Sequence, residues 1–236
     1  MSIRDSFSHT GPISIRTRST GAFRTGAKAQ SEVAQQARTT FRFSVIICTY
    51  NRRNLVLAAL ASLRRQSLPA QYFEVIVVDN GSSDGTFNAI QTYLSANTVY
   101  QRSLEERWSI HCLLEERNGL AYARNTGITS SSGEILVFLD DDVLVDPYFL
   151  ERLLATYEET QADAVGGCVN LHWESYKPYW LTYDMLPTFG YYVPFHSRTQ
   201  LPDDLSFSNS CFSLKRQVLQ QVGGFSPFLT KRLHSP

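Results

Sequence analysis

Blocks of apolar residues alternate with mixed polar segments along the chain, and their spacing predicts strands and helices in turn. Short apolar runs, most of them rich in β-branched residues, predict strands at 43–48, 73–78, 108–114, 135–139 and 164–169. Apolar residues three and four positions apart predict helices at 55–66, 86–94, 119–128 and 146–159. Nearly continuous apolar strands that alternate with helices are typical of a parallel sheet covered on both faces. The pattern therefore predicts an α/β fold, a three-layer α/β/α sandwich with a mostly parallel, Rossmann-like sheet.

Three polar segments follow directly after predicted strands. They are Cys-Thr-Tyr-Asn at 48–51, Asp-Asn at 79–80 and Asp-Asp-Asp at 140–142. In open α/β sheets, ligands bind outside the carboxyl ends of the strands. We therefore expect the three segments to converge on one site.

The aspartate triplet carries the clearest chemical signal of the three. Adjacent carboxylates repel one another, and a hard divalent cation such as Mg²⁺ or Mn²⁺ relieves that repulsion. Because side chains of an extended chain alternate in direction, Asp140 and Asp142 form the natural pair. The alternative is an Asp-rich turn that caps the next helix, but Asp146, followed by Pro147, already fits the capping role. The triplet therefore favours a metal site.

Further motifs extend this arrangement along the chain. Asn-Gly-Leu-Ala-Tyr-Ala-Arg-Asn stands at 118–125, Ser-Asn-Ser-Cys-Phe at 208–212 and Val-Gly-Gly-Phe at 222–225. In order and spacing, across residues 43 to about 230, these motifs resemble the family 2 inverting glycosyltransferases of the GT-A fold. The resemblance implies a sugar transfer from a nucleoside diphosphate donor to an acceptor hydroxyl, with inversion and with Mg²⁺ or Mn²⁺ as cofactor.

The resemblance also implies where the donor binds. Thr49, Tyr50 and Asp79 would contact the donor, with the Asp79 carboxylate accepting a hydrogen bond from its base or ribose. Asp79 can also simply begin the Asp-Asn-Gly turn, and a threonine at a strand end is unremarkable. Arg124 and Asn125 match the family's Ala-Arg-Asn motif, whose cation lies near the nucleotide. A solvated helix face is the alternative for Arg124.

The same resemblance gives the triplet two roles. Asp142 and Asp140 would hold the metal, which bridges the diphosphate and neutralises the leaving group, while Asp140 and Asp141 line the substrate site. We expect Arg52 and Arg53, before the first helix, to face solvent. A sugar-phosphate nucleotidyltransferase or a dinucleotide-binding domain needs a glycine-rich phosphate loop here, and residues 48–53 contain no glycine.

The catalytic base is not identified. In the family it is an acidic residue beyond the Gly-Gly-Phe segment, whereas nothing after Asp204 in this chain is acidic. The expected base therefore falls outside the sequence, and we interpret Asp203 and Asp204 as loop residues. A truncated, donor-binding but inactive remnant is the alternative hypothesis.

An aromatic segment follows the last predicted strand. It has no clear periodicity and contains Trp173, Tyr176, Tyr179, Trp180 and Tyr183. Such side chains can stack on a sugar or lipid acceptor, or they can pack the segment down against the body. The family implies a carbohydrate or glycolipid acceptor, as in cell-envelope polysaccharide assembly, and no nucleic-acid partner.

Charge divides the chain unevenly. The net charge is zero, but the first 42 residues hold seven basic and two acidic residues, which leaves fifteen and twenty for the remainder. We predict a disordered, basic Ser/Thr/Arg-rich tail at 1–41, one glycosyltransferase domain at 42–230 and a short tail at 231–236.

Location and redox state follow from two further features. No apolar stretch reaches the 18 residues of a membrane span, and the N-terminus lacks a secretory signal, so we predict a cytoplasmic protein. Peripheral membrane association through the basic tail stays open. The wide spacing of Cys48, Cys112, Cys168 and Cys211 favours buried thiols over disulfides or a zinc site.

Overall fold

The computed structural model describes residues 13–15, 42–99, 108–173, 176–193, 197–203 and 205–229. The helices and strands in this part of the chain, with η for short 3-10 helices, are β1 (Ile13–Ile15), β2 (Phe43–Thr49), α1 (Arg53–Leu63), η1 (Ala70–Tyr72), β3 (Phe73–Asp79), α2 (Thr86–Val99), β4 (Ser109–Leu114), α3 (Leu120–Thr129), β5 (Ile135–Asp140), α4 (Phe149–Thr160), β6 (Ala164–Gly166), η2 (Tyr183–Phe189), β7 (Cys211–Lys215), α5 (Arg216–Val222) and η3 (Pro227–Leu229).

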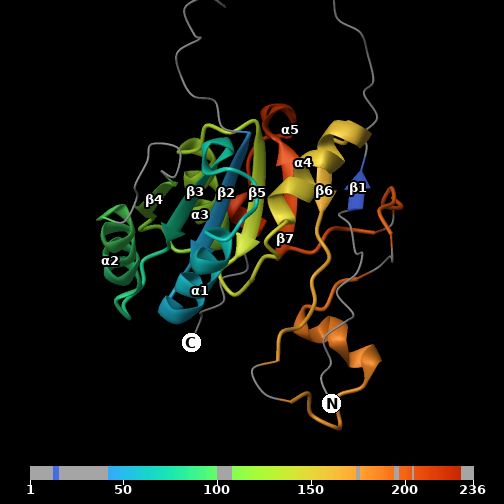
Figure 1. Cartoon of the computed structure of the whole chain (residues 1–236), viewed down its shortest axis with the longest axis horizontal. Helices are drawn as coiled ribbons and strands as arrows, with labels where there is room; N and C mark the ends of the chain where they lie inside the picture. Colours follow the sequence, from blue (N-terminus) through green and yellow to red (C-terminus); the bar gives the residue numbers. More distant parts are fainter. Residues whose placement is uncertain are drawn as a thin grey trace, which may run out of the picture.

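One seven-stranded sheet, in the order β1-β6-β7-β5-β2-β3-β4, forms the centre of the molecule (Figure 1). Strands β2, β3, β4 and β5 pair in parallel, while β7 runs antiparallel to both β5 and β6. Five of the seven strands therefore run in one direction, which confirms the predicted mostly parallel sheet. Every residue of β3 is buried, as a strand covered on both faces requires.

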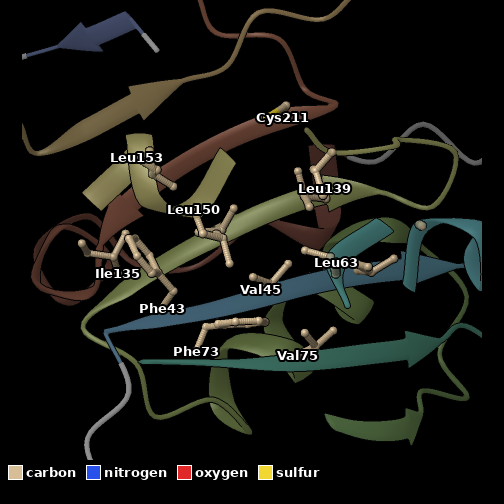
Figure 2. Close-up of a cluster of buried hydrophobic side chains, with 14 of the residues drawn as sticks. Phe43, Val45, Leu63, Phe73, Val75, Ile135, Leu139, Leu150, Leu153 and Cys211 are labelled. Carbon is tan, nitrogen blue, oxygen red and sulfur yellow. The ribbon is translucent and has the colours of Figure 1, made fainter. Parts of the chain in front are cut away.

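Two clusters of apolar side chains separate the layers. Alternate strand residues such as Phe43, Val45 and Val75 pack with α1, α2 and α4 on one face (Figure 2). The intervening residues, including Ile46 and Phe138, pack with α3 and α5 on the other face. Because side chains alternate along a strand, both faces are apolar and both are covered by helices. The three-layer α/β/α sandwich predicted from the sequence is confirmed.

Helix α3 approaches the sheet closely at Gly127. A Cβ atom at this position would lie 2.5 Å from Cγ2 of Ile46 on β2. A larger residue would therefore force the helix away from the sheet. This matters because α3 also carries two of the predicted site residues.

Four predicted boundaries are wrong by three residues or more. Helix α1 ends at Leu63 rather than at residue 66, and α2 continues to Val99 rather than ending at residue 94. Helix α4 begins at Phe149 rather than at Asp146, because the Asp146 carboxylate accepts a hydrogen bond from the Tyr148 amide (2.9 Å) and holds a turn ahead of the helix. Strand β6 ends at Gly166 rather than at residue 169, since the Gly167 amide donates to the Cys211 carbonyl and Val169 pairs with Tyr192.

The structure also adds elements that the pattern did not predict. Strand β7 and helix α5 follow the aromatic segment, and β1 pairs antiparallel with β6 inside the segment predicted to be a disordered tail. The rest of that tail, and residues 231–236, lie outside the described residues. None of the four cysteines, all within the described ranges, forms a disulfide bond; Cys211 is buried and the other three are partly buried. None of the helices in the described ranges combines the length and apolar character that crossing a bilayer requires.

Candidate active site

Three neighbouring strands end in polar residues at one edge of the sheet. Strands β3, β2 and β5 lie side by side, with Thr49 in register with Asp79 and Cys48 in register with Asp140. Parallel strands carry their carboxyl ends to the same edge, where ligands of α/β proteins bind. The structure thus brings together Thr49, Asp79 and the aspartate triplet, which are far apart in the sequence.

The three aspartates of the triplet occupy different environments. Asp141 is buried and accepts hydrogen bonds from the Thr49 hydroxyl at 2.8 Å and from Nη1 of Arg52 at 3.0 Å. Asp142 accepts from the same Nη1 at 3.1 Å, and about half of its side chain is exposed. Asp140 is partly exposed, with Nη2 of Arg124 3.8 Å from its Oδ1. Asp141 is therefore an internal anchor, while Asp140 and Asp142 can reach a ligand.

Burial shapes the ionisation of this cluster. Desolvation raises the pKa of both Asp140 and Asp141 above the usual aspartate value. Hydrogen bonds oppose this rise, from Ser210 on Asp140 and from Thr49 on Asp141, as do the charges of Arg124 and Arg52. The two arginines thus offset part of the repulsion within the triplet.

Arg52 is exposed, as expected, but the expectation missed its contacts. About half of its side chain is accessible, and its guanidinium bridges Asp141 and Asp142. Arg53, the next residue, is exposed as expected. Nothing in the local sequence distinguishes the two arginines, because the partners of Arg52 lie in the turn after β5, about ninety residues later.

Asp79 is fully buried at the end of β3. Its Oδ1 accepts a hydrogen bond from the Ser82 amide at 2.8 Å, and among the described residues its Oδ2 has no partner. A buried carboxylate oxygen without a partner is costly unless a ligand supplies the donor. The turn at 79–82 therefore uses one oxygen of Asp79 and leaves the other without a partner among the described residues.

The loop after β2 is held by the loop after β3. Asn51 adopts a left-handed backbone conformation with φ 54°, and its Oδ1 accepts from the Ser83 amide at 2.7 Å. The Asn51 amide in turn donates to the Ser82 hydroxyl at 2.8 Å. Tyr50, one residue earlier, is 43% exposed at this edge. Sequence reasoning missed this role of Asn51, although an asparagine is the residue type that tolerates a positive φ.

A buried polar network fixes the neighbouring loop between β4 and α3. The Glu115 carboxylate accepts two hydrogen bonds from the Arg117 side chain, at 2.8 and 2.7 Å, and one from the Thr126 hydroxyl. Asn80 donates to the carbonyls of Glu115 and Arg117 and accepts from the Gly119 amide at 2.9 Å. This loop therefore reaches the site edge in a defined position.

Arg124 and Asn125 of α3 meet the Gly-Gly-Phe segment. Arg124 is buried, donates to the Asn209 carbonyl at 3.2 Å, and has the rings of Phe225, Phe212 and Phe138 within 5.1 to 6.0 Å. The Asn125 amide group donates to the Phe225 carbonyl at 2.8 Å and accepts from the Phe225 amide at 2.9 Å. Arg124 is thus not on a solvated face, and Asn125 holds the chain after α5.

The accessible carboxylates suit a hard divalent cation. Within the described ranges, no group of three or more His, Cys, Asp or Glu side chains is arranged to enclose a metal. Mg²⁺ bound with a phosphorylated substrate commonly takes one or two carboxylates and completes its shell with phosphate oxygens and water. Asp140 and Asp142 fit that donor set.

Comparison with known proteins identifies the class to which this fold and site belong. The profile of Glycosyl transferase family 2 matches residues 44–223, so the chain belongs to this family. Glycosyltransferase AglE of Haloferax volcanii is 39% identical over 126 residues, covering 53% of this chain and 38% of that protein. The glucosyl-dolichyl phosphate glucuronosyltransferase of the same organism is 29% identical over 197 residues, covering 78% and 56%. The chain thus spans about half, or less, of the length of these two relatives.

Solved structures share the fold. The mannosyltransferase PcManGT of Pyrobaculum calidifontis, in complex with GDP-Man and Mn²⁺, has a TM-score of 0.58 at 23% identity, covering 80% of this chain and 49% of that chain. TarS 1–349 of S. aureus, in complex with UDP, has a TM-score of 0.56 at 21% identity, covering 81% and 52%. The described domain therefore has the GT-A fold that its motifs indicated.

Proposed function

We propose that this chain transfers a sugar from a nucleoside diphosphate donor to an acceptor hydroxyl, with inversion at the anomeric carbon and with Mg²⁺ or Mn²⁺ at Asp142 and Asp140. Family membership supports glycosyl transfer in general. The donor, the metal and the stereochemistry are inferences from the site. We extend the proposal to a cytoplasmic location, peripheral to the membrane if the acceptor is a glycolipid.

The observation that carries the proposal is the unpartnered Oδ2 of Asp79. This oxygen is buried at the carboxyl edge of the sheet, beside the strand that ends in Thr49. An ionised carboxylate only accepts hydrogen bonds, so the missing partner is an N–H or O–H donor. The base and the ribose of a nucleoside both carry such donors. Asp79 therefore binds the nucleoside, with Tyr50 exposed nearby to contact it.

The aspartate triplet lies where the diphosphate of the donor would extend from a nucleoside bound at Asp79. Asp142 and Asp140 point accessible carboxylates to this edge, and Asp141 is fixed from below by Thr49. A bound Mg²⁺ or Mn²⁺ would neutralise the charge that develops on the leaving diphosphate. PcManGT, whose structure contains both GDP-Man and Mn²⁺, supports this choice of cofactor.

Arg124 and Asn125 support the site in different ways. The buried Arg124 guanidinium lies next to Asp140 and stabilises its charge. Asn125 uses its side-chain amide on Phe225, so we assign it to positioning the segment after α5 rather than to touching the donor. Among the described residues, no carboxylate is assigned as the catalytic base.

The acceptor is expected to bind beside the aromatic segment. The chain leaves the sheet after β6 and returns to it at β7. Both junctions lie at the edge that carries Asp140, because Leu139 at the end of β5 pairs with Cys211, and Gly166 at the end of β6 pairs with Phe212. The segment extends away from the sheet, in orange in Figure 1. Its five predicted aromatic residues are at least 38% exposed and are not packed down. Exposed Trp and Tyr rings favour a sugar or a glycolipid.

A donor screen tests the proposed function. The purified chain is incubated with UDP- and GDP-sugars and Mn²⁺, and release of the nucleoside diphosphate is measured with and without candidate acceptors. We expect release from one donor class, and its loss in Asp79→Asn. Glu158→Gln, an exposed change on α4, is the matched control. Donor binding without release from any donor would instead identify a donor-binding protein that does not turn over.

A further inference from the structure

Arg52 is the one arginine that contacts two members of the aspartate triplet in the described part of the chain. Its Nη1 lies 3.0 Å from Oδ1 of Asp141 and 3.1 Å from Oδ2 of Asp142. Asp142 is also the carboxylate best exposed to a metal ion. The guanidinium therefore occupies the side of Asp142 that faces Asp141, and a metal ion at Asp142 must compete with it.

The backbone aims Arg52 at the triplet. Arg52 is the residue before α1, and its carbonyl accepts the first helical hydrogen bond, from the Val56 amide at 3.1 Å. The preceding Asn51 is held in its left-handed conformation by Ser82 and Ser83. These contacts fix the backbone from which the side chain starts, although the side chain itself is half exposed.

Most of the hydrogen-bonding capacity of Arg52 is unused. Both contacts with the triplet use Nη1, while a guanidinium carries five N–H donors in a planar fork. Within the described residues, Nε and Nη2 have no acceptor. A planar fork matches phosphate oxygens better than any other side chain does. The remaining donors are therefore available to a phosphorylated ligand at the same edge.

We propose that Arg52 is a ligand of the donor diphosphate and that it competes with the divalent cation for Asp142. Without a metal ion, Arg52 holds the Asp142 carboxylate; with a divalent cation at Asp142, it would stay paired with Asp141 and donate its remaining N–H groups to the diphosphate. This inference rests on the proposed function, because it assumes a nucleoside diphosphate at this site.

Two binding measurements test this role without turnover. Binding of Mn²⁺ alone is followed by electron paramagnetic resonance, and binding of UDP and GDP with Mn²⁺ is followed by calorimetry. In Arg52→Gln we expect Mn²⁺ alone to bind about two- to fivefold more tightly, because an exposed competing ion pair is removed. We expect the preferred nucleoside diphosphate to bind about tenfold more weakly, because a charge-assisted contact is lost. Binding of the parent nucleoside, uridine or guanosine, should not change.

Matched variants separate this role from a general loss of charge or of folding. Arg53→Gln removes the adjacent exposed arginine and should match the wild type in both assays. Arg52→Lys keeps the charge without the planar fork, so its affinity for the nucleoside diphosphate should fall between those of the wild type and Arg52→Gln. Equal Mn²⁺ and nucleoside diphosphate affinities in Arg52→Gln and wild type would overturn the inference. A wild type that binds neither UDP nor GDP would instead reject the proposed function.

Discussion

The contact between Thr49 and Asp141 joins two strands at the point where the proposed chemistry takes place. Both residues are almost completely buried, and their side-chain oxygens are 2.8 Å apart. A buried carboxylate that loses a hydrogen-bond donor bears the full cost of its desolvation. The threonine hydroxyl therefore contributes to the stability of the domain as well as to the site.

Replacing this hydroxyl should destabilise the fold measurably. Thr49→Val keeps the side-chain shape but leaves Oδ2 of Asp141 without its donor, so we expect the free energy of unfolding to fall by about 1–3 kcal/mol. Urea denaturation measures the change. Thr49→Ser retains the hydroxyl, so its free energy of unfolding should fall clearly less. Wild-type stability in Thr49→Val would show that the hydrogen bond contributes nothing.

Residue types alone predicted a functional role for the three aspartates, since three adjacent carboxylates after an apolar strand have few structural uses. They did not predict Arg52 or Asn51. The partners of these residues lie in the loops after β3 and β5, 31 to 90 residues later in the chain, and a local pattern contains no information about them. The same limit applies to Asn125, whose motif indicated a nucleotide contact and whose side chain lies on Phe225, 100 residues later.

Element boundaries show where tertiary contacts override local pattern. Strands β2, β3, β4 and β5 and helix α3 agree with the predicted elements to within one residue at each end, whereas α1 and α2 are found where predicted but end three residues earlier and five residues later. Helix α4 and strand β6 differ because hydrogen bonds accepted by the Asp146 carboxylate and by the Cys211 carbonyl redirect the chain at their ends. Strand β7 and helix α5 are short and contain several polar residues, so their apolar pattern is weak.

The loop between β4 and α3 should make stability depend on pH in the acid range. Hydrogen bonds from the Arg117 side chain lower the pKa of Glu115 from 4.5 to about 2. A folded-state pKa below the unfolded value gives stability that is present above about pH 4.5 and is lost as the pH falls toward 2.

Denaturation at several pH values checks this contribution. We expect Glu115→Gln to be less stable than the wild type at pH 7, and we expect the difference to shrink between pH 4.5 and pH 2. Glu116→Gln, at the exposed neighbouring position, should follow the wild type throughout. A difference that is independent of pH would contradict the assigned ionisation.

Helix α3 and the segment after α5 are joined through one side chain. Asn125 pairs with both backbone polar groups of Phe225, as a neighbouring strand would. A Cβ atom on Gly224 would lie 2.7 Å from Oδ1 of Asn125, so this glycine allows the close contact. The Phe225 ring next to Arg124 depends on the same contact.

Amide hydrogen exchange can detect the loss of this contact. In Asn125→Ala we expect the Phe225 amide to exchange about fivefold faster or more, because its acceptor is removed. Amides of β2 and β3 are internal controls and should not change. Unaltered exchange at Phe225 would mean that the segment is held by its ring packing alone.

At the scale of the whole molecule, the proposed donor and acceptor sites occupy different elements along one edge. The proposed donor residues lie on or directly after β2, β3 and β5, while the aromatic segment follows β6 and precedes β7. Tyr179 and Trp180 are 98% and 54% exposed, so they contribute little to the core. Their replacement should therefore separate acceptor binding from donor binding.

Alanine variants of the aromatic segment test this separation. With an acceptor identified in the donor screen, we expect Tyr179→Ala and Trp180→Ala to raise the acceptor KM about three- to tenfold, as the loss of ring stacking predicts. The donor KM and the urea midpoint should not change. Tyr72→Ala, an exposed tyrosine at the amino end of β3, is the control. Unchanged acceptor kinetics in both variants would locate the acceptor elsewhere.

The central claim is that the edge of the sheet binds a nucleoside diphosphate through a metal held by the triplet. Calorimetric titration of the chain with UDP and GDP, in Mn²⁺ and in EDTA, tests it most directly when wild type and Asp142→Asn are compared. We predict binding of one of the two nucleotides that requires Mn²⁺ and weakens at least about tenfold in Asp142→Asn. Equal binding in Mn²⁺ and EDTA, unaffected by Asp142→Asn, would contradict the assigned role of the triplet.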